Sequence, residues 1–285
     1  MTFRAACIQL NSSNVPEENI AAVYRLVRAA AKDGATYIQT PEMTNIVDRD
    51  RENLAARIRP EASDPSIAAF SKLAAELGIV LHVGSLALAE PEGRIANRAF
   101  VFGPDGRTIA RYDKIHLYDV DLPNGESWRE SAVYHPGDRA VIAETPFARL
   151  GVTICYDVRF PQLYRTLAHA GATVLTAPAA FTKLTGEAHW QVLQRARAIE
   201  NGAFMISAAQ AGKHADGRET WGHSIIVAPW GEVLAEGGPD GEEIVVAEID
   251  IARSIEARQR IPVLKNERRF QGPEVPGVVP LRSVS

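Results

Sequence analysis

The chain has 285 residues, of which 46% are hydrophobic and 23% charged, a composition typical of a globular protein with a sizeable core. Its formal net charge is −4, and its 31 basic residues are scattered among 35 acidic ones. This balance offers no basic field for nucleic acid or anionic lipid. No apolar run approaches the ~18–20 residues of a membrane span. The N-terminal stretch has none of the parts of a secretory signal, so we expect none.

The chain contains two cysteines, Cys7 and Cys155. A single long-range disulfide without a secretory signal is uncommon, so we expect free thiols in a reducing, cytoplasmic setting. Two cysteines cannot build a thiolate metal site, and the histidines show no ligand spacing such as HExxH. We therefore expect no metal.

Strand-like and helix-like segments alternate through the first part of the chain. Strands are predicted over 3–10, 37–40, 79–88, 97–103 and 108–112. One helix is predicted over 16–32 from apolar residues at helical spacing, and a second from Asp64 as N-cap. Residues 103–106 (GPDG) predict a hairpin turn between the last two strands.

The same alternation continues after a long polar stretch. Strands are predicted over 140–144, 149–155, 173–177, 204–208, 224–228 and 243–249, and helices near Pro161 and over 187–201. A turn at 229–231 is predicted to join the last two strands. The pattern indicates a layered α/β protein with mixed sheets, in which residues 1–270 form a single domain.

Two segments stand apart from this pattern. Residues 113–139 are too polar and turn-rich for regular structure, and long loops of this kind are usually functional or disordered. The C-terminal tail, 271–285, contains several Pro and Gly residues. It is expected either to be disordered or to wrap a neighbouring subunit.

Cys155 is the first candidate for chemistry because it ends a predicted strand shortly before a predicted helix. A thiol at such a turn lies near helix N–H groups, which favour its thiolate. The alternative is a buried apolar filler, as most free cysteines are. The abrupt change to polar residues after Cys155, at Tyr156, Asp157 and Arg159, argues against a filler.

A cysteine hydrolase needs a base that takes the thiol proton and returns it to the leaving amine. The seven histidines show no accompanying Asn/Asp signature of a Cys–His enzyme. Glu42 and Lys114 each follow a predicted strand, where α/β sheets gather their ligands. Either residue alone could be an ordinary surface side chain.

Taken together, Glu42, Lys114 and Cys155 resemble, in this order, the Glu-Lys-Cys triad of the nitrilase superfamily of carbon–nitrogen hydrolases. The matching stretches are 39–43 (QTPEM), 111–117 (RYDKIHL) and 151–161 (GVTICYDVRFP), with further similarity at 181–190, 194–201, 221–224 and 229–231. The likeness runs from the first strand to about Phe270.

The resemblance implies a four-layer α-β-β-α sandwich, commonly paired into a homodimer or higher homo-oligomer. It implies no nucleic-acid or membrane partner and no metal or organic cofactor. A second glutamate is usual in the loop after the lysine. Glu130 matches that position, whereas Glu126 fits the pattern less well.

The resemblance also implies a role for each residue. Cys155 would add to an amide carbonyl, and Lys114 with the backbone N–H of Tyr156 would stabilise the oxyanion. Glu42 would pass the thiol proton to the departing nitrogen, release ammonia and activate water on the thioester. Glu130 would orient Lys114 or the substrate.

The substrate is suggested by two neighbouring side chains. Arg159 is placed to pair with a substrate carboxylate, although a structural salt bridge with Asp157 or another acid is an equal alternative. Phe181 could line the pocket or be an ordinary core aromatic. The stretches 155–161 and 208–214 are most similar to the branch holding omega-amidase and deaminated glutathione amidase, whose substrates are carboxylate-bearing amides.

Two other functions compete with amide hydrolysis. A nitrile or N-carbamoyl hydrolase would use the same triad and differ in its activity on nitriles. A catalytically silent small-molecule-binding protein of the same fold is the other alternative, against which the intact Glu42, Lys114, Glu130 and Cys155 argue. A Rossmann oxidoreductase is not supported, because no GxGxxG follows the first strand.

Overall fold

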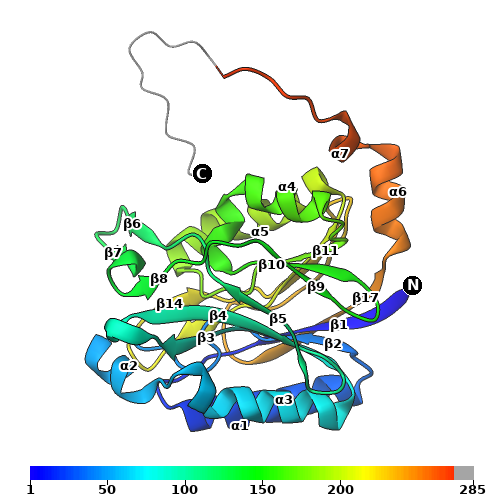
Figure 1. Ribbon diagram of the computed structural model, residues 1–285. Helices are drawn as coiled ribbons and strands as arrows, with labels where there is room; N and C mark the ends of the chain where they lie inside the picture. The colour runs from blue at the N-terminus through cyan, green and yellow to red at the C-terminus, as the bar shows by residue number, and fades with distance from the viewer. Residues whose placement is uncertain (273–285) are drawn as a thin grey trace.

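The computed structural model describes residues 1–272, in which two β-sheets pack face to face (Figure 1). The first sheet has seven strands, with the order β17-β1-β2-β3-β4-β5 and with β8 paired to β4. Its strands are β1 (Thr2–Gln9), β2 (Tyr37–Gln39), β3 (Val80–Ala89), β4 (Ile95–Phe102), β5 (Thr108–Asp113), β8 (Tyr134–His135) and β17 (Glu243–Asp250). Its centre, β1-β2-β3, is parallel, and β17 and β4 flank it in antiparallel pairing.

The second sheet has six strands in the order β16-β15-β12-β11-β10-β9. They are β9 (Val141–Glu144), β10 (Arg149–Val152), β11 (Val174–Thr176), β12 (Phe204–Ser207), β15 (Ile225–Val227) and β16 (Val233–Glu236). It repeats the plan of the first sheet, since β10, β11 and β12 are parallel and antiparallel strands flank them.

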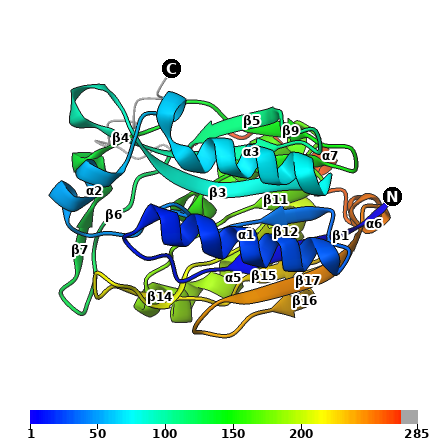
Figure 2. The ribbon, with the colours of Figure 1, turned by 90° about the horizontal axis from the view of Figure 1, so that it is seen from below.

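Helices cover the outer face of each sheet (Figures 1 and 2). The first sheet is covered by α1 (Pro16–Lys32) and α3 (Pro65–Leu77), and the second by α4 (Pro161–His169) and α5 (Lys183–Asn201). The layers are therefore helix, sheet, sheet and helix, which confirms the predicted α-β-β-α sandwich. Each sheet has apolar side chains on both faces, as sheets covered on both sides require.

The helices begin and pack as their sequences indicate. The stripe predicted for α1 is buried at Val23 and Val27, which lie in the cluster between that helix and its sheet. Asp64 caps α3, because its side chain accepts a hydrogen bond from the backbone N–H of Ser66, and Pro65 fills the first helical position. Gly78 ends this helix in the left-handed conformation.

Four sequence expectations are wrong in detail. The strand predicted over 149–155 ends at Val152, and Cys155 opens a 3-10 helix, η4 (Cys155–Arg159). α5 begins one turn before the predicted residue 187. The turn at 229–231 leads into β16 rather than β17, which pairs with β1 in the other sheet. The polar segment 113–139 holds short elements, namely β6 (Asp119–Asp121), β7 (Ser127–Arg129), η3 (Glu130–Ala132) and β8.

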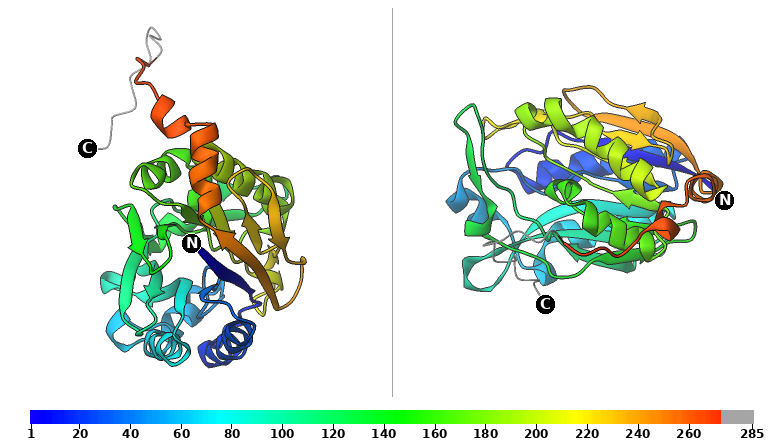
Figure 3. Two further views of the ribbon diagram at one scale, coloured as in Figure 1. Left: turned by 90° about the vertical axis from the view of Figure 1, so that its right-hand side faces the viewer. Right: turned by 90° about the horizontal axis from the view of Figure 1, so that it is seen from above.

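Several short elements are absent from the sequence prediction. They are α2 (Arg51–Arg57), β13 (Ala211–Lys213), β14 (Glu219–Trp221), α6 (Ala252–Arg260) and α7 (Val263–Asn266). In Figure 3, α6 follows β17 past the N-terminus along one end of the sandwich. It leads to α7, after which Glu267 contacts His169 of α4 at 2.5 Å. The prediction for the C-terminal tail concerns residues that, beyond 272, lie outside the part of the chain described. Within residues 1–272, no helix is long and apolar enough to cross a membrane.

Gly84 lets the chain leave β2 close to β3. The pairing of β3 with β4 shifts register between Val83 and Leu86. A Cβ atom at Gly84 would lie only 2.2 Å from the carbonyl oxygen of Thr40 and 2.6 Å from the carbonyl carbon of Pro41. Only glycine admits this approach of the two backbones. The segment that carries Glu42 is thereby held against β3.

Candidate active site

Glu42, Lys114, Glu130 and Cys155 come from four separate segments and meet at one end of the sandwich. Glu42 lies just beyond β2, Lys114 directly after β5, Glu130 at the start of η3 and Cys155 at the start of η4. The ammonium Nζ of Lys114 donates to Oε1 of Glu42 at 2.8 Å and to both carboxylate oxygens of Glu130 at 3.0 and 2.9 Å. Lys114, only 1% exposed, is thus a buried cation between two carboxylates.

Each carboxylate is also held by neutral donors. The side-chain amide of Asn97 donates to Oε1 of Glu42, and the backbone N–H of Ala180 donates to its Oε2, each at 2.9 Å. The backbone N–H of Tyr118 donates to Oε2 of Glu130 at 2.7 Å. Charge-assisted bonds of this kind fix both carboxylates in place.

Burial and the charges of the neighbouring groups together shift the pKa values of Glu42, Lys114 and Glu130. Burial alone would raise the pKa of Glu42, but the Lys114 cation and hydrogen bonds from Cys155, Lys114 and Asn97 outweigh burial and lower that pKa. Burial would lower the pKa of Lys114, yet Glu130 and Glu42 hold it well above its ordinary value. Burial raises the pKa of Glu130, against the opposing effect of Lys114. Lys114 therefore stays cationic and Glu42 stays ionised near neutral pH.

Cys155 is a thiol in the resting site. Burial raises its pKa well above the ordinary value, and the charge of Glu42 and a hydrogen bond to that carboxylate raise it further. Lys114 opposes these effects without reversing them. The sequence expectation that helix N–H groups would favour the thiolate is wrong, because burial and a neighbouring carboxylate dominate. The arrangement is that of a thiol beside an ionised base.

The backbone at Cys155 is in a conformation that L-residues rarely adopt. Its φ is 49°, in the left-handed region, and its N–H donates to the carbonyl oxygen of Pro178 at 2.9 Å. Met43, next to Glu42, also has a positive φ, of 57°. Such strained residues cluster at functional sites, where the surrounding structure holds them.

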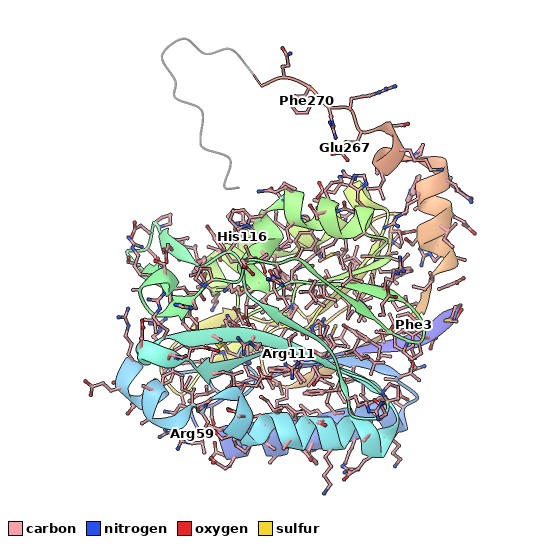
Figure 4. The ribbon with its side chains drawn as sticks, in the orientation of Figure 1. Phe3, Arg59, Arg111, His116, Glu267 and Phe270 are labelled. Carbon is pink, nitrogen blue, oxygen red and sulfur yellow. The ribbon has the colours of Figure 1, made fainter. Side chains whose placement is uncertain are left out.

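Asp157 holds the turn that carries Cys155. Its buried carboxylate accepts hydrogen bonds from the backbone N–H of Ile154 at 2.9 Å and from the hydroxyl of Tyr112 at 2.6 Å. It also accepts one from the backbone N–H of His116 at 3.1 Å and contacts Nδ1 of that imidazole at 2.7 Å. His116 stacks on Phe160, just before α4, with ring centroids 3.5 Å apart (Figure 4). Asp157 therefore ties η4 to the segment that carries Lys114.

These groups open onto a cavity of about 370 Å³. Its lining includes Glu42, Lys114, Glu130, Cys155, Tyr156, Ala180 and Phe181, together with side chains from the 118–134 segment. Phe181 lines the cavity and also packs on Trp190, with ring centroids 4.9 Å apart, so it has both of the roles considered for it. Among the described residues, no group of three or more His, Cys, Asp or Glu side chains could hold a metal ion.

Arg159 lies behind the cavity wall formed by two aromatic rings. Its guanidinium carbon is 5.3 Å from the ring centroid of Phe181 and 5.8 Å from that of Tyr156, and Nη1 lies 3.3 Å from Nδ1 of His189. Within residues 1–272, Arg159 forms no ion pair, and the Asp157 carboxylate accepts hydrogen bonds from other donors.

Sequence reasoning missed several residues of the site. Asn97 lies in β4, whose residues other than Asn97 and Arg98 are apolar, and a buried polar side chain in such a strand is a usable signal. Tyr118, Trp128 and Tyr134 belong to the polar segment 113–139, in which only Lys114, Glu130 and Glu126 were considered. Ala180 contributes only its backbone N–H, which no side-chain pattern could indicate. Glu126 lines the cavity but does not contact Lys114.

Comparisons with known proteins agree with this fold. The carbon–nitrogen hydrolase family profile matches residues 4–259. Human omega-amidase NIT2 is 39% identical over 271 residues, covering 94% of this chain and 95% of the human protein. The crystal structure of the Caenorhabditis elegans NitFhit protein superposes with a TM-score of 0.86 and 33% identity, covering 94% of this chain and 65% of that chain.

A third similar structure concerns the cysteine itself. An amidase from Nesterenkonia sp. AN1, 25% identical with a TM-score of 0.76, matches 91% of this chain and 98% of its own. Its structure, determined for a glutamine-for-glutamate mutant, shows the result of Michael addition of acrylamide at the active-site cysteine.

The sandwich fold and the span of the family profile define the class of protein. This chain belongs to the carbon–nitrogen hydrolase family. Within the family, its similarity to human omega-amidase extends over nearly the whole length of both chains.

The coupling of Glu42 to Cys155 gives a testable pH dependence. In Glu42→Gln, the loss of the carboxylate removes a charge and a hydrogen bond that raise the Cys155 pKa. We expect the pH profile of Cys155 alkylation by iodoacetamide, followed by mass spectrometry, to move to lower pH. Turnover of an amide should fall at least about a hundredfold, because the base is lost.

Glu126→Gln is the matched control, since Glu126 lines the same cavity without contacting Lys114. It should leave the alkylation profile unchanged. An unchanged or higher midpoint in Glu42→Gln would contradict the coupling. Cys155→Ala corrects for any reaction at Cys7.

Proposed function

We propose that the protein is an amidase that hydrolyses small carboxylate-bearing amides through a thioester on Cys155. The observation that carries this proposal is the Lys114 ammonium, which bridges Glu42 and Glu130 within 3.0 Å beside the Cys155 thiol. Similarity to human omega-amidase and to an amidase with a reactive active-site cysteine supports the same reaction.

The first half of the reaction forms the thioester. Glu42 accepts the thiol proton as Cys155 Sγ adds to the amide carbonyl, whose π electrons move onto the oxygen. Lys114 and the backbone N–H of Tyr156 stabilise that oxyanion, and the loss of one such donor typically costs about 3 kcal/mol. Glu42 then gives the proton to the nitrogen, the C–N bond breaks, and ammonia leaves when the amide is unsubstituted.

The second half returns the enzyme to its starting state. Glu42 takes a proton from water, and the resulting hydroxide adds to the thioester carbonyl. The C–S bond breaks as the sulfur regains the proton, and the carboxylic acid product leaves. Glu130 orients Lys114 throughout and keeps it charged, since its carboxylate raises the Lys114 pKa.

Ammonia release from a panel of compounds tests this proposal. The panel holds 2-oxoglutaramate, 2-oxosuccinamate, simple aliphatic amides and nitriles, with Cys155→Ala as control. We expect turnover of a carboxylate-bearing amide that is abolished in the control. Activity on nitriles alone would support the nitrile hydrolase alternative, and silence with Cys155 still alkylated would support the binding protein.

We assign the substrate carboxylate to Arg159. Its guanidinium has no ion pair among the residues described, and it borders the cavity residues Tyr156 and Phe181. A structural salt bridge, the alternative considered for Arg159, has no support from its contacts. A guanidinium whose neighbours are aromatic rings remains free to bind an incoming carboxylate.

Arg159→Ala should therefore impair carboxylate-bearing amides selectively. We expect kcat/KM to fall about ten- to a hundredfold for 2-oxoglutaramate, the range of a lost charged hydrogen bond. Neutral aliphatic amides should change less than about threefold. Arg139→Ala, at an 87% exposed side chain, is the matched control. An equal loss on charged and neutral amides would contradict the assignment.

We also propose a homodimer in a reducing, cytoplasmic setting. The apolar side chains of Leu184, Val192 and Ile199 lie exposed on one side of α5. Trp230, which is 52% exposed, precedes Gly231, and the Ile199 side chain lies next to Gly231. We name these four residues the α5 stripe. The helix lies on the outer surface of the sandwich (Figure 3). Exposed apolar side chains on one side of an outer helix favour burial against a second copy. Both cysteines are free thiols, which supports the reducing setting.

Val192→Glu should weaken the dimer, because it places a charge in the α5 stripe, where Val192 is 68% exposed. Sedimentation velocity should show more monomer at micromolar concentration than in the unaltered protein. Ala21→Glu, exposed on α1, is the matched control. A monomeric unaltered protein, or a Val192→Glu variant of unchanged mass, would contradict the proposal.

A further inference from the structure

We propose that Arg49 and Arg218, grouped around Trp128, form a second anion subsite in the cavity, distinct from Arg159. We name these three residues the Trp128 subsite. It would bind a second carboxylate of the substrate, so that the preferred amides are dianions. The proposal rests on the proposed function, whose catalytic groups line the same cavity.

Three segments far apart in the chain build the Trp128 subsite. Arg49 precedes α2, Trp128 lies in β7, and Arg218 belongs to the turn between β13 and β14. The guanidinium carbons of Arg49 and Arg218 lie 4.8 and 4.7 Å from the centroid of the Trp128 ring. All three side chains line the cavity that holds Cys155. Two like charges therefore share one aromatic ring at the wall of the site.

Within the described part of the chain, Arg49 has no acidic partner and Arg218 has one, at a long distance. Arg218 is only 15% exposed, and its one acidic neighbour is Asp216, whose Oδ2 lies 3.6 Å from Nε. That separation exceeds a hydrogen bond, and both atoms are buried without a hydrogen-bond partner. Arg49 is exposed, lies over the Trp128 ring and forms no ion pair with the residues described. Because the ion pair with Asp216 is long, the other N–H groups of the Arg218 guanidinium can form a charge-assisted bond with a ligand oxygen.

Tyr134 links the Trp128 subsite to the catalytic charges. Its buried phenol lies close enough to Glu130 and Glu42 for their charges to raise its pKa, beyond the larger effect of burial. Arg218 opposes that shift from another direction. Tyr134 also lines the cavity. Tyr134 is therefore within electrostatic range of both Arg218 and the catalytic carboxylates.

The other cations of the cavity do not offer the same site. Lys114 is occupied by Glu42 and Glu130, and Arg129 forms two contacts of 2.8 and 2.9 Å with Asp121. Arg51 lines the cavity, but the guanidinium groups over the Trp128 ring are those of Arg49 and Arg218. A guanidinium stacked on a ring keeps the N–H groups of its edge free, and this planar fork matches a carboxylate.

Two cationic positions imply two substrate carboxylates. With one on Arg159 and one on the Trp128 subsite, the scissile amide would lie between them, one carboxylate on the acyl part and the other on the departing amine. N-Glutarylglycine has this form, and glutaric monoamide has the same acyl part without the second carboxylate. The pair isolates the contribution of the second anion.

Binding measured by calorimetry in a Cys155→Ala background tests the subsite without turnover. Arg218→Gln and Arg49→Gln should each weaken N-glutarylglycine about ten- to a hundredfold, as expected for a lost charged hydrogen bond. Glutaric monoamide should change less than about threefold. Arg51→Gln removes the same charge from the same cavity, and it should alter both ligands by less than about threefold.

Three outcomes would overturn the proposal. They are equal weakening of both ligands in Arg218→Gln, an effect of Arg51→Gln as large as that of Arg218→Gln, and no effect of either subsite variant. If Arg218→Gln lowers the thermal unfolding temperature, the exposed Arg49 carries the test. Selective binding of the dianion in a protein without amidase activity would refute the proposed function and leave the subsite standing.

Discussion

The arrangement of this site depends on one buried cation. Lys114 is 1% exposed, and an ammonium in such surroundings is unstable unless carboxylates and their hydrogen bonds compensate the lost hydration. Glu42 and Glu130 supply that compensation from two different loops, and Asn97, Ala180 and Tyr118 hold the carboxylates in turn. Removing one member of a buried ion pair typically costs about 3–5 kcal/mol, because the remaining charge is left unpaired. The same three charges that define the chemistry therefore join β2, β5 and η3.

The position of the nucleophile depends on a second constraint, which is the backbone conformation of Cys155 and not a charge. Cys155 has a φ of 49°, a conformation that costs free energy for any residue but glycine. The surrounding contacts hold it there, with the Cys155 N–H on Pro178 and the Asp157 carboxylate on the N–H of Ile154. Since Asp157 also accepts from Tyr112 and His116, the turn is fixed to the segment that carries Lys114. The distance between thiol and cation is thus set by the fold rather than by flexible loops.

Much of the layered architecture could be predicted, because the spacing of apolar residues along each helix or strand matches the face that it buries. Glu42, Lys114 and Cys155 were singled out because each follows a predicted strand and because, in this order, they resemble the triad of the nitrilase superfamily. The protonation state of Cys155 could not be predicted, since it depends on burial and on Glu42 in three dimensions. β16 was missed because it is a short, partly exposed strand at a sheet edge. Arg49, Trp128 and Arg218 come from three separate segments of the chain, and no spacing in one of them indicates the others.

The charge of the catalytic cluster also constrains its substrates. Glu42, Glu130 and Lys114 together carry about one negative charge when both carboxylates are ionised, and a nearby substrate carboxylate is repelled by it. The raised pKa of Glu130 reduces this repulsion without removing it. An enzyme for anionic amides therefore needs cations away from the reacting carbonyl, where they attract the substrate without neutralising the base. Arg159 beside Tyr156 and Phe181, and Arg49 and Arg218 around Trp128, meet that requirement.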